Sequence, residues 1–173
     1  MEEKVKQALH NAFRPTLILS WLICVMIFLY PAAVGFILIR FESFAGFAPL
    51  TPVSFNLLQL FCLVLVGVVF TVCKRWHNSL LELPNRKLQG EQEMTWVFEH
   101  FVLRSLFIMA LSELGAILGF LLFLLQATGP SFIFFFLLTL AQMVYFFPRY
   151  QNWERVVLYH LKMYVEEQVA NTH

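Results

Sequence analysis

The chain has 173 residues, of which 60% are hydrophobic and 13% are charged, whereas an average soluble domain is about 45–50% apolar and about 25% charged. These values exclude an ordinary soluble protein and predict an all-α integral membrane protein, in which residues 1–173 form a single membrane domain with four transmembrane helices. The net charge of +1 and the lack of a basic run exclude a nucleic-acid partner.

An amphipathic pattern precedes the first apolar run. Apolar side chains recur at helical spacing at Val5, Ala8, Leu9, Ala12 and Phe13. This pattern predicts an amphipathic helix on the membrane surface, and docking onto a partner subunit is the alternative. The first predicted span follows over residues 16–39, where Pro31 predicts a kink.

The second predicted span covers residues 53–73, and a polar loop over residues 74–100 leads to the third span, over residues 101–125. Negative charge in the first turn after Gly90 favours a helix start there. We expect one continuous helix from Glu91 to Gln126, about 54 Å long at ~1.5 Å per residue. Because the hydrocarbon core is roughly 30 Å thick, the first part of this helix should project beyond the bilayer.

The fourth predicted span, residues 131–147, is followed by a tail over residues 148–173. Mostly apolar residues recur in the tail at helical spacing, at Trp153, Val156, Val157, His160, Leu161, Tyr164 and Val165. The pattern predicts a second amphipathic surface helix at this terminus, with docking onto a partner again as the alternative.

The basic residues predict the orientation of the spans. Three Lys or Arg residues precede the first span, four lie in the loop over residues 74–100 and three lie in the tail, whereas only Arg40 lies between the first two spans. The positive-inside bias therefore predicts that both termini and the central loop are cytoplasmic, in a bacterial-type inner membrane. The lipid bilayer is one expected partner, and a homo-oligomer or other membrane subunits are the others.

Glu113 is the central residue of the run 101–125 and its only acidic residue. A charge at the middle of the bilayer costs at least about 2.5 kcal/mol. We therefore expect the carboxyl to be protonated, bound to a cation, or hydrogen-bonded inside the bundle. The polar residues predicted to contact it are Ser112 in the same run and Thr139 and Gln142 in the fourth.

Small residues follow the glutamate at Gly115, Ala116 and Gly119. Residues of this size let a second helix approach closely, so this face is predicted to pack against a helix. Two interpretations stay open at this point. Glu113 is either an ion-binding carboxyl or a buried, neutral, hydrogen-bonded group on a packing face.

The segment "FIMALSELGAILGFLLFLL", Phe107 to Leu125, resembles the carboxylate-bearing helix of the proteolipid, or c subunit, of rotary ATP synthases and V-type ATPases. Glu113 falls on the position of the essential carboxylate. Ala116, Ile117 and Gly119 fall on the Ala-Ile-x-Gly-like segment that follows it. The resemblance implies that Glu113 takes up and releases H⁺ or Na⁺.

The sequence thus predicts a small membrane subunit in which Glu113 binds H⁺ or Na⁺ within an ion-translocating complex. The alternative is a non-catalytic structural or assembly subunit whose small-residue face docks a partner. No nucleophile with an adjacent base and no zinc-like histidine spacing occurs in the sequence. We therefore predict that the chain is not an enzyme by itself and has no metal or other cofactor besides H⁺ or Na⁺.

Overall fold

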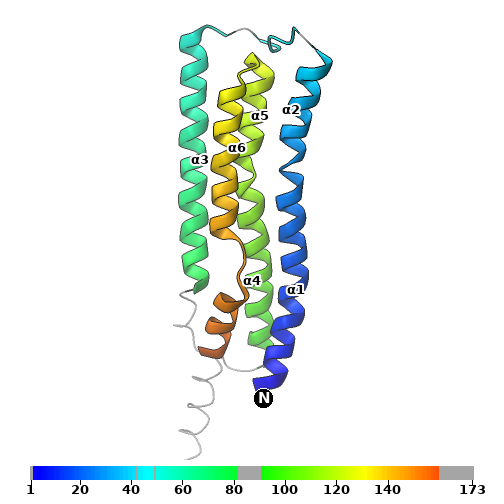
Figure 1. Cartoon of the computed structure of the whole chain (residues 1–173). Helices are drawn as coiled ribbons and strands as arrows, with labels where there is room; N and C mark the ends of the chain where they lie inside the picture. Colours follow the sequence, from blue (N-terminus) through cyan, green and yellow to red (C-terminus); the bar gives the residue numbers. More distant parts are fainter. Residues whose placement is uncertain (1, 42, 49, 82–90, 160–173) are drawn as a thin grey trace, which may run out of the picture.

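The computed structural model describes residues 2–41, 43–48, 50–81 and 91–159. In these residues the fold is an elongated bundle of helices (Figure 1). Four helical stretches of the described residues are long and apolar enough to span a membrane, and they cover Leu9–Arg40, Pro52–Ser79, Glu99–Gln126 and Gly129–Tyr159. The predicted all-α, multi-pass membrane protein is confirmed at this level.

The first span consists of two helices, α1 (Glu2–Met26) and α2 (Leu29–Arg40). The interruption lies four residues before Pro31, whose ring displaces the carbonyl of residue i−4 and which has no N–H to donate. The Tyr30 N–H donates instead to the Ile27 carbonyl, at 3.3 Å, which tightens the turn. The helix is thus interrupted one turn before Pro31, the residue at which the sequence predicts a kink.

The prediction of a separate surface helix at the N-terminus is wrong, because α1 continues from Glu2 into the first span without interruption. Its apolar residues Leu9 and Phe13 are buried within the chain, against Phe101 and the tail residue Trp153. The helix formed by residues 150–159 therefore packs on the bundle and covers this cluster. The rest of the predicted tail helix lies outside the described residues.

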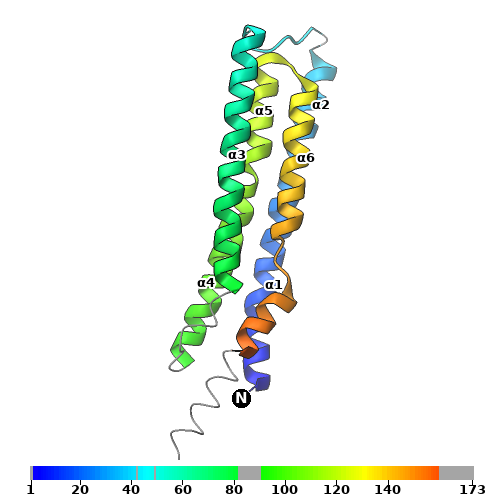
Figure 2. The ribbon, with the colours of Figure 1, turned by 90° about the vertical axis from the view of Figure 1, so that its left-hand side faces the viewer.

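Helix α3 (Pro52–Leu81) is the longest element, with 30 residues. It extends eight residues beyond the predicted end of the second span, so part of the predicted loop is helical. Helix α4 (Glu91–Ser112) begins at Glu91, as predicted. Figure 2 shows α3 running alongside the third and fourth spans.

The expected continuous helix from Glu91 to Gln126 is interrupted at Glu113, between α4 and α5 (Leu114–Gln126). The prediction of continuity is therefore wrong. The Glu113 N–H donates to the Ala110 carbonyl three residues earlier, at 3.2 Å. This i→i−3 bond tightens the last turn of α4, and regular helix resumes when the Ile117 N–H donates to the Glu113 carbonyl at 3.2 Å.

The C-terminal end of α5 lies at the end of the bundle opposite the N-terminus, and the loop between α2 and α3 packs against it there (Figure 1). The N–H groups of Phe47 and Ala48 donate to the carbonyls of Leu124 and Leu125, at 2.9 and 3.1 Å. These bonds satisfy acceptors that a helix end leaves free. Gly46, with φ +92°, lies against the Leu125 backbone so closely that a side chain would not fit. Helix α6 (Gly129–Phe146) then returns along α5.

Candidate functional site

The two helix interruptions meet at Glu113. Tyr30, in the first turn of α2, donates a hydrogen bond from its hydroxyl to Oε1 of Glu113, at 3.0 Å. Tyr30 and Glu113 are both half-buried. The contact therefore joins the first and third spans at the points where both helices are broken.

Local backbone geometry explains why the Glu113 side chain is available for this contact. Glu113 is the N-cap residue of α5 with φ −68° and ψ −21°, and its side chain makes no capping hydrogen bond. Its carboxyl is therefore free to accept from Tyr30. The position at a helix N-terminus also favours negative charge, because the helix dipole is positive there.

Two of the three polar residues predicted to contact Glu113 use their hydroxyls elsewhere. Ser112 donates to the Ile108 carbonyl at 2.8 Å, and Thr139 donates to the Phe135 carbonyl at 3.0 Å. Gln142 is buried on α6. The structure thus buries Ser112, Thr139 and Gln142 in the interior, but the hydrogen bond to the Glu113 carboxyl comes from Tyr30.

Sequence reasoning missed Tyr30, although a signal was present. Tyr30 lies near the middle of the predicted span 16–39, as Glu113 does in the span 101–125. Matching the depth of polar groups across all spans pairs these two residues. Pro31, directly after the tyrosine, predicts a helix break at the same depth in the membrane.

On one side of α5, the predicted small-residue face is packed against α6. Gly115, Ala116 and Gly119 are all buried. A Cβ at Gly119 would lie 2.6 Å from the Phe135 Cβ, and a Cβ at Gly115 would overlap the Thr139 hydroxyl. A side chain at either position would therefore displace its neighbour on α6, and a helix of this same chain occupies the face.

Elsewhere on the third span, an open groove runs along the surface where α1 and α4 meet; we call it the α1–α4 groove. It has a volume of about 520 Å³ and includes Glu113 in its lining. The other lining residues are all apolar and come from α1 and α4: Leu19, Leu22, Ile23, Met26, Leu103, Leu106, Phe107 and Ala110. The lining side chains of Leu22, Leu103 and Phe107 are more than half exposed, so the groove opens on the surface that faces lipid.

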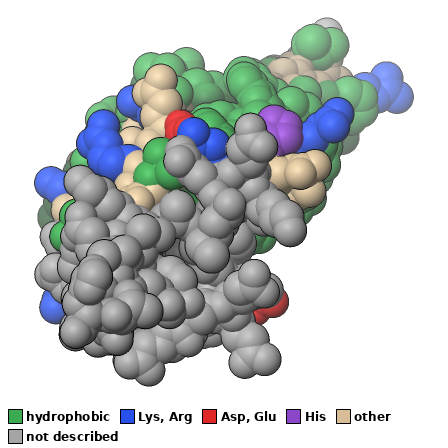
Figure 3. Space-filling model, turned by 90° about the horizontal axis from the view of Figure 1, so that it is seen from below, with side chains coloured by type: hydrophobic (Ala, Val, Ile, Leu, Met, Phe, Trp, Pro, Cys, Tyr) green, Lys and Arg blue, Asp and Glu red, His purple; other side chains and the backbone are tan. Residues whose placement is uncertain are grey.

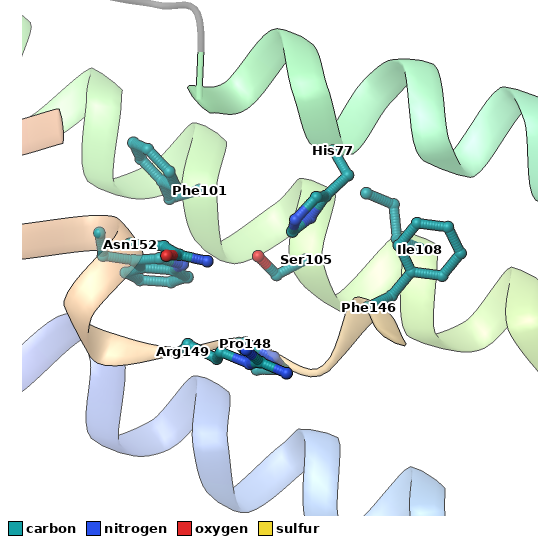
Figure 4. Close-up of a pocket in the computed structure, with 9 residues that line it drawn as sticks. His77, Phe101, Ser105, Ile108, Phe146, Pro148, Arg149 and Asn152 are labelled. Atoms are coloured by element: carbon teal, nitrogen blue, oxygen red, sulfur yellow. The ribbon is translucent and has the colours of Figure 1, made fainter. Parts of the chain in front are cut away.

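A second polar cluster lies nearer the N-terminal end of the bundle. The side chains of His77, Ser105 and Asn152 point toward one another around a cavity of about 10 Å³ (Figure 4). Pro148 and Arg149 also line this cavity, from the segment after α6. A volume of this size holds about one water molecule. The cluster ties the segment after α6 to α3 and α4.

The described residues contain no group of three or more His, Cys, Asp or Glu side chains that could hold a metal ion. The fold and the Glu113 site define a class, an all-helical multi-pass membrane protein with a carboxyl at a break in the middle of a span. Comparison with protein-family models, with curated proteins and with solved structures finds no match for this chain.

Proposed function

We propose that this chain is a small membrane subunit in which Glu113 reversibly binds H⁺ within an ion-translocating complex. The observation that carries the proposal is the position of the carboxyl. Glu113 lies at a helix break, accepts a hydrogen bond from Tyr30, and lines the α1–α4 groove. The resemblance of Phe107 to Leu125 to the proteolipid helix of rotary ATPases supports the same role.

Magnitudes favour a carboxyl that can exist in both forms. A charge at the bilayer centre costs at least about 2.5 kcal/mol. An interhelical hydrogen bond in a membrane contributes about 0.6 kcal/mol on average. The bond from Tyr30 therefore offsets part of the cost of the charge, and a bound proton removes that cost altogether.

The surroundings favour H⁺ over Na⁺ as the ion. A hard metal cation takes several oxygen ligands. Near Glu113 the Tyr30 hydroxyl is the described hydrogen-bond partner, and the hydroxyls of Ser112 and Thr139 are engaged with backbone carbonyls. Every other residue lining the α1–α4 groove is apolar. A proton needs only the carboxylate itself.

The proposed orientation places both termini in the cytoplasm of a bacterial-type inner membrane. Figure 3 shows Lys and Arg side chains around the end of the molecule seen from below in Figure 1, which is the end where the N-terminus lies. Exposed basic residues near the ends of the spans on this side of the molecule are Arg14, Lys74, Arg75, Arg149 and Arg155. The positive-inside bias supports this assignment.

The apolar outer face of α3 supports the proposed partners. Leu57, Phe61 and Val64 are each more than half exposed. These residues contact the lipid bilayer, a second copy of the chain, or another membrane subunit.

A structural or assembly role is the second candidate, and the Tyr30–Glu113 hydrogen bond is the observation that favours it. In that role the carboxyl only links α2 to the third span. Since α6 already covers Gly115 and Gly119, the docking of a partner would use another surface. A glutamine at position 113 still accepts a hydrogen bond, so it separates the two roles.

The test is chemical modification of the full chain in lipid vesicles with dicyclohexylcarbodiimide, a hydrophobic reagent that reacts with protonated carboxyls. We expect labelling of Glu113 that rises as the pH falls across about pH 5 to 9. Added Na⁺ should leave the labelling unchanged, whereas protection by Na⁺ would show that the site binds Na⁺ instead.

Two variants serve as controls. Glu113→Gln should abolish labelling. Glu99→Gln should leave it unchanged, because Glu99 is exposed at the start of the third span and about 21 Å away along the helix, at ~1.5 Å per residue. Absence of labelling in the folded wild-type chain over the whole pH range would refute the ion-binding role and favour the structural one.

A further inference from the structure

We propose that the α1–α4 groove is a binding site for a lipophilic organic cation, an ion with one positive charge on a large apolar body, whose charge pairs with Glu113. The inference rests on the proposed function to the extent that Glu113 must be able to carry a negative charge. It adds a second ligand, besides H⁺, that binds to the same carboxyl.

The size and lining of the groove suit such a ligand. It is an open hollow of about 520 Å³ on the surface of the bundle, which gives a small molecule room to lie along α1 and α4. Eight of its nine lining residues are apolar, and Glu113 is the ninth. An apolar body therefore finds matching side chains along α1 and α4, and a single charge finds a single counter-charge.

Charge complementarity determines the sign of the ligand. The lining contains no Lys, Arg or His, so an anion would meet only the carboxylate and be repelled. A neutral molecule gains nothing from the carboxylate, which then takes up a proton instead of staying charged in a medium of low dielectric constant. A cation pairs with the carboxylate and neutralises it.

A large cation is favoured over a small one for a physical reason. The cost of moving an ion out of water falls as its charge is spread over a larger radius, and a compact metal ion needs oxygen ligands that the groove lacks. Phe107, which is 52% exposed, adds an aromatic face within the groove, and such faces attract organic cations.

The groove is accessible from the bilayer. Leu22 and Leu103, on opposite walls, are 54% and 67% exposed. A lipophilic cation that has partitioned into the membrane can thus enter sideways, without a passage through the bundle. At Glu113 it competes with a proton: binding to the protonated carboxyl releases one H⁺ and leaves a carboxylate–cation pair.

The experiment measures binding of tetraphenylphosphonium to the full chain in lipid nanodiscs by equilibrium dialysis. We expect one saturable site per chain, with an affinity that weakens about tenfold for each pH unit once Glu113 is mainly protonated. Tetraphenylphosphonium should also protect the wild-type chain from dicyclohexylcarbodiimide. This protection assay needs no variant, so it remains decisive if a substitution disturbs folding.

Variants define the site. Glu113→Gln should weaken binding at least about tenfold, because one charge pair is lost. Ala110→Phe should also weaken binding, because the larger side chain fills part of the groove. Glu99→Gln should bind as the wild type does.

The outcomes separate this inference from the proposed function. Carbodiimide labelling without tetraphenylphosphonium binding overturns the inference and leaves the H⁺ site intact. Equal binding of neutral triphenylphosphine or of the tetraphenylborate anion identifies the groove as a general lipid site and also overturns it. Binding that Glu113→Gln does not change has the same meaning. Absence of both labelling and binding overturns both proposals.

Discussion

The third span differs on the two sides of Glu113. Beyond it, α5 lies so close to α6 that Gly119 and Phe135 leave no room for a methyl group. Before it, the surface where α4 meets α1 carries the α1–α4 groove, and Leu103 in that groove is 67% exposed. The span thus has a closely packed half, α5 against α6, and a half, α4, of which one face is open, and the carboxyl lies at the boundary.

This difference shows how a membrane protein can hold a carboxyl firmly and still leave it reachable. Association of helices in lipid depends on close packing and interhelical hydrogen bonds, since lipid is as apolar as the side chains it replaces. The contact between α5 and α6 provides the packing, and Tyr30 provides a hydrogen bond to the first span. The α1–α4 groove leaves the carboxyl accessible from one side.

The largest expected effect is the loss of stability when a buried leucine of α5 is shortened, compared with an exposed leucine of α4. Leu122→Ala removes a side chain that is 1% exposed, and the resulting cavity should lower the free energy of unfolding by about 2 to 3 kcal/mol. Leu103→Ala removes a side chain that faces lipid and should change it by less than about 0.5 kcal/mol. Unfolding of the purified protein by titration with SDS measures both. Equal losses would contradict the difference between the packed face of α5 and the open face of α4.

Glycine substitutions sharpen the comparison because they should have opposite signs. Gly119→Ala places a Cβ against Phe135 and should destabilise the protein by about 1 to 2 kcal/mol. Gly67→Ala, in α3, meets nothing within 4 Å. It should be neutral or should stabilise by up to about 1 kcal/mol, through higher helix propensity. The same SDS titration provides the measurement, and destabilisation by both substitutions would count against a specific close contact at Gly119.

How much the sequence predicts depends on whether a feature is local. Hydropathy predicts the four spans, because the length of an apolar run is a property of that segment alone. Pro31 likewise predicts the break before it, because a proline has no N–H to donate within its own helix. The break at Glu113 carries no comparable signal, since neither proline nor a charged run marks it. Only the structure shows this break, because there the Glu113 N–H donates to the Ala110 carbonyl, three residues earlier, in place of the carbonyl four residues earlier.

The contacts between segments were the least predictable part. Leu9 and Phe13 have the spacing of a helix on a membrane surface, yet their apolar face meets Phe101 and Trp153. A period in the sequence identifies an apolar face but not the surface that covers it. The same limit explains why Ser112 and Thr139 were predicted to bond to Glu113, whereas Tyr30, 83 residues away in the sequence, does so.

A double substitution tests the closely packed half at a single contact. Gly115→Ala should cost about 1 kcal/mol, because the new Cβ meets the Thr139 hydroxyl. In a Thr139→Ala background that hydroxyl is gone, and the added cost of Gly115→Ala should fall to nearly zero. SDS unfolding of the four chains of the cycle measures the coupling. An additive pair would place the close contact elsewhere.

The smallest expected effect belongs to the hydrogen bond between Tyr30 and Glu113. Tyr30→Phe removes the hydroxyl and keeps the ring, which still packs 5.7 Å from the ring of Phe120. Interhelical hydrogen bonds in membranes contribute about 0.6 kcal/mol on average, so the loss should be about that size. Tyr145→Phe, at a half-exposed position on α6, is the matched control and should change nothing measurable.

The double-mutant cycle of Tyr30→Phe with Glu113→Ala isolates this bond from other effects of either substitution. We expect a coupling of about 0.6 kcal/mol between Tyr30 and Glu113. A cycle of Tyr145→Phe with Glu113→Ala should show none. Because Tyr30 belongs to α2, coupling confined to Tyr30 would mean that the first span helps to fix the position of the carboxyl. Zero coupling at Tyr30 would leave the contact with α6 as the main constraint on the position of Glu113.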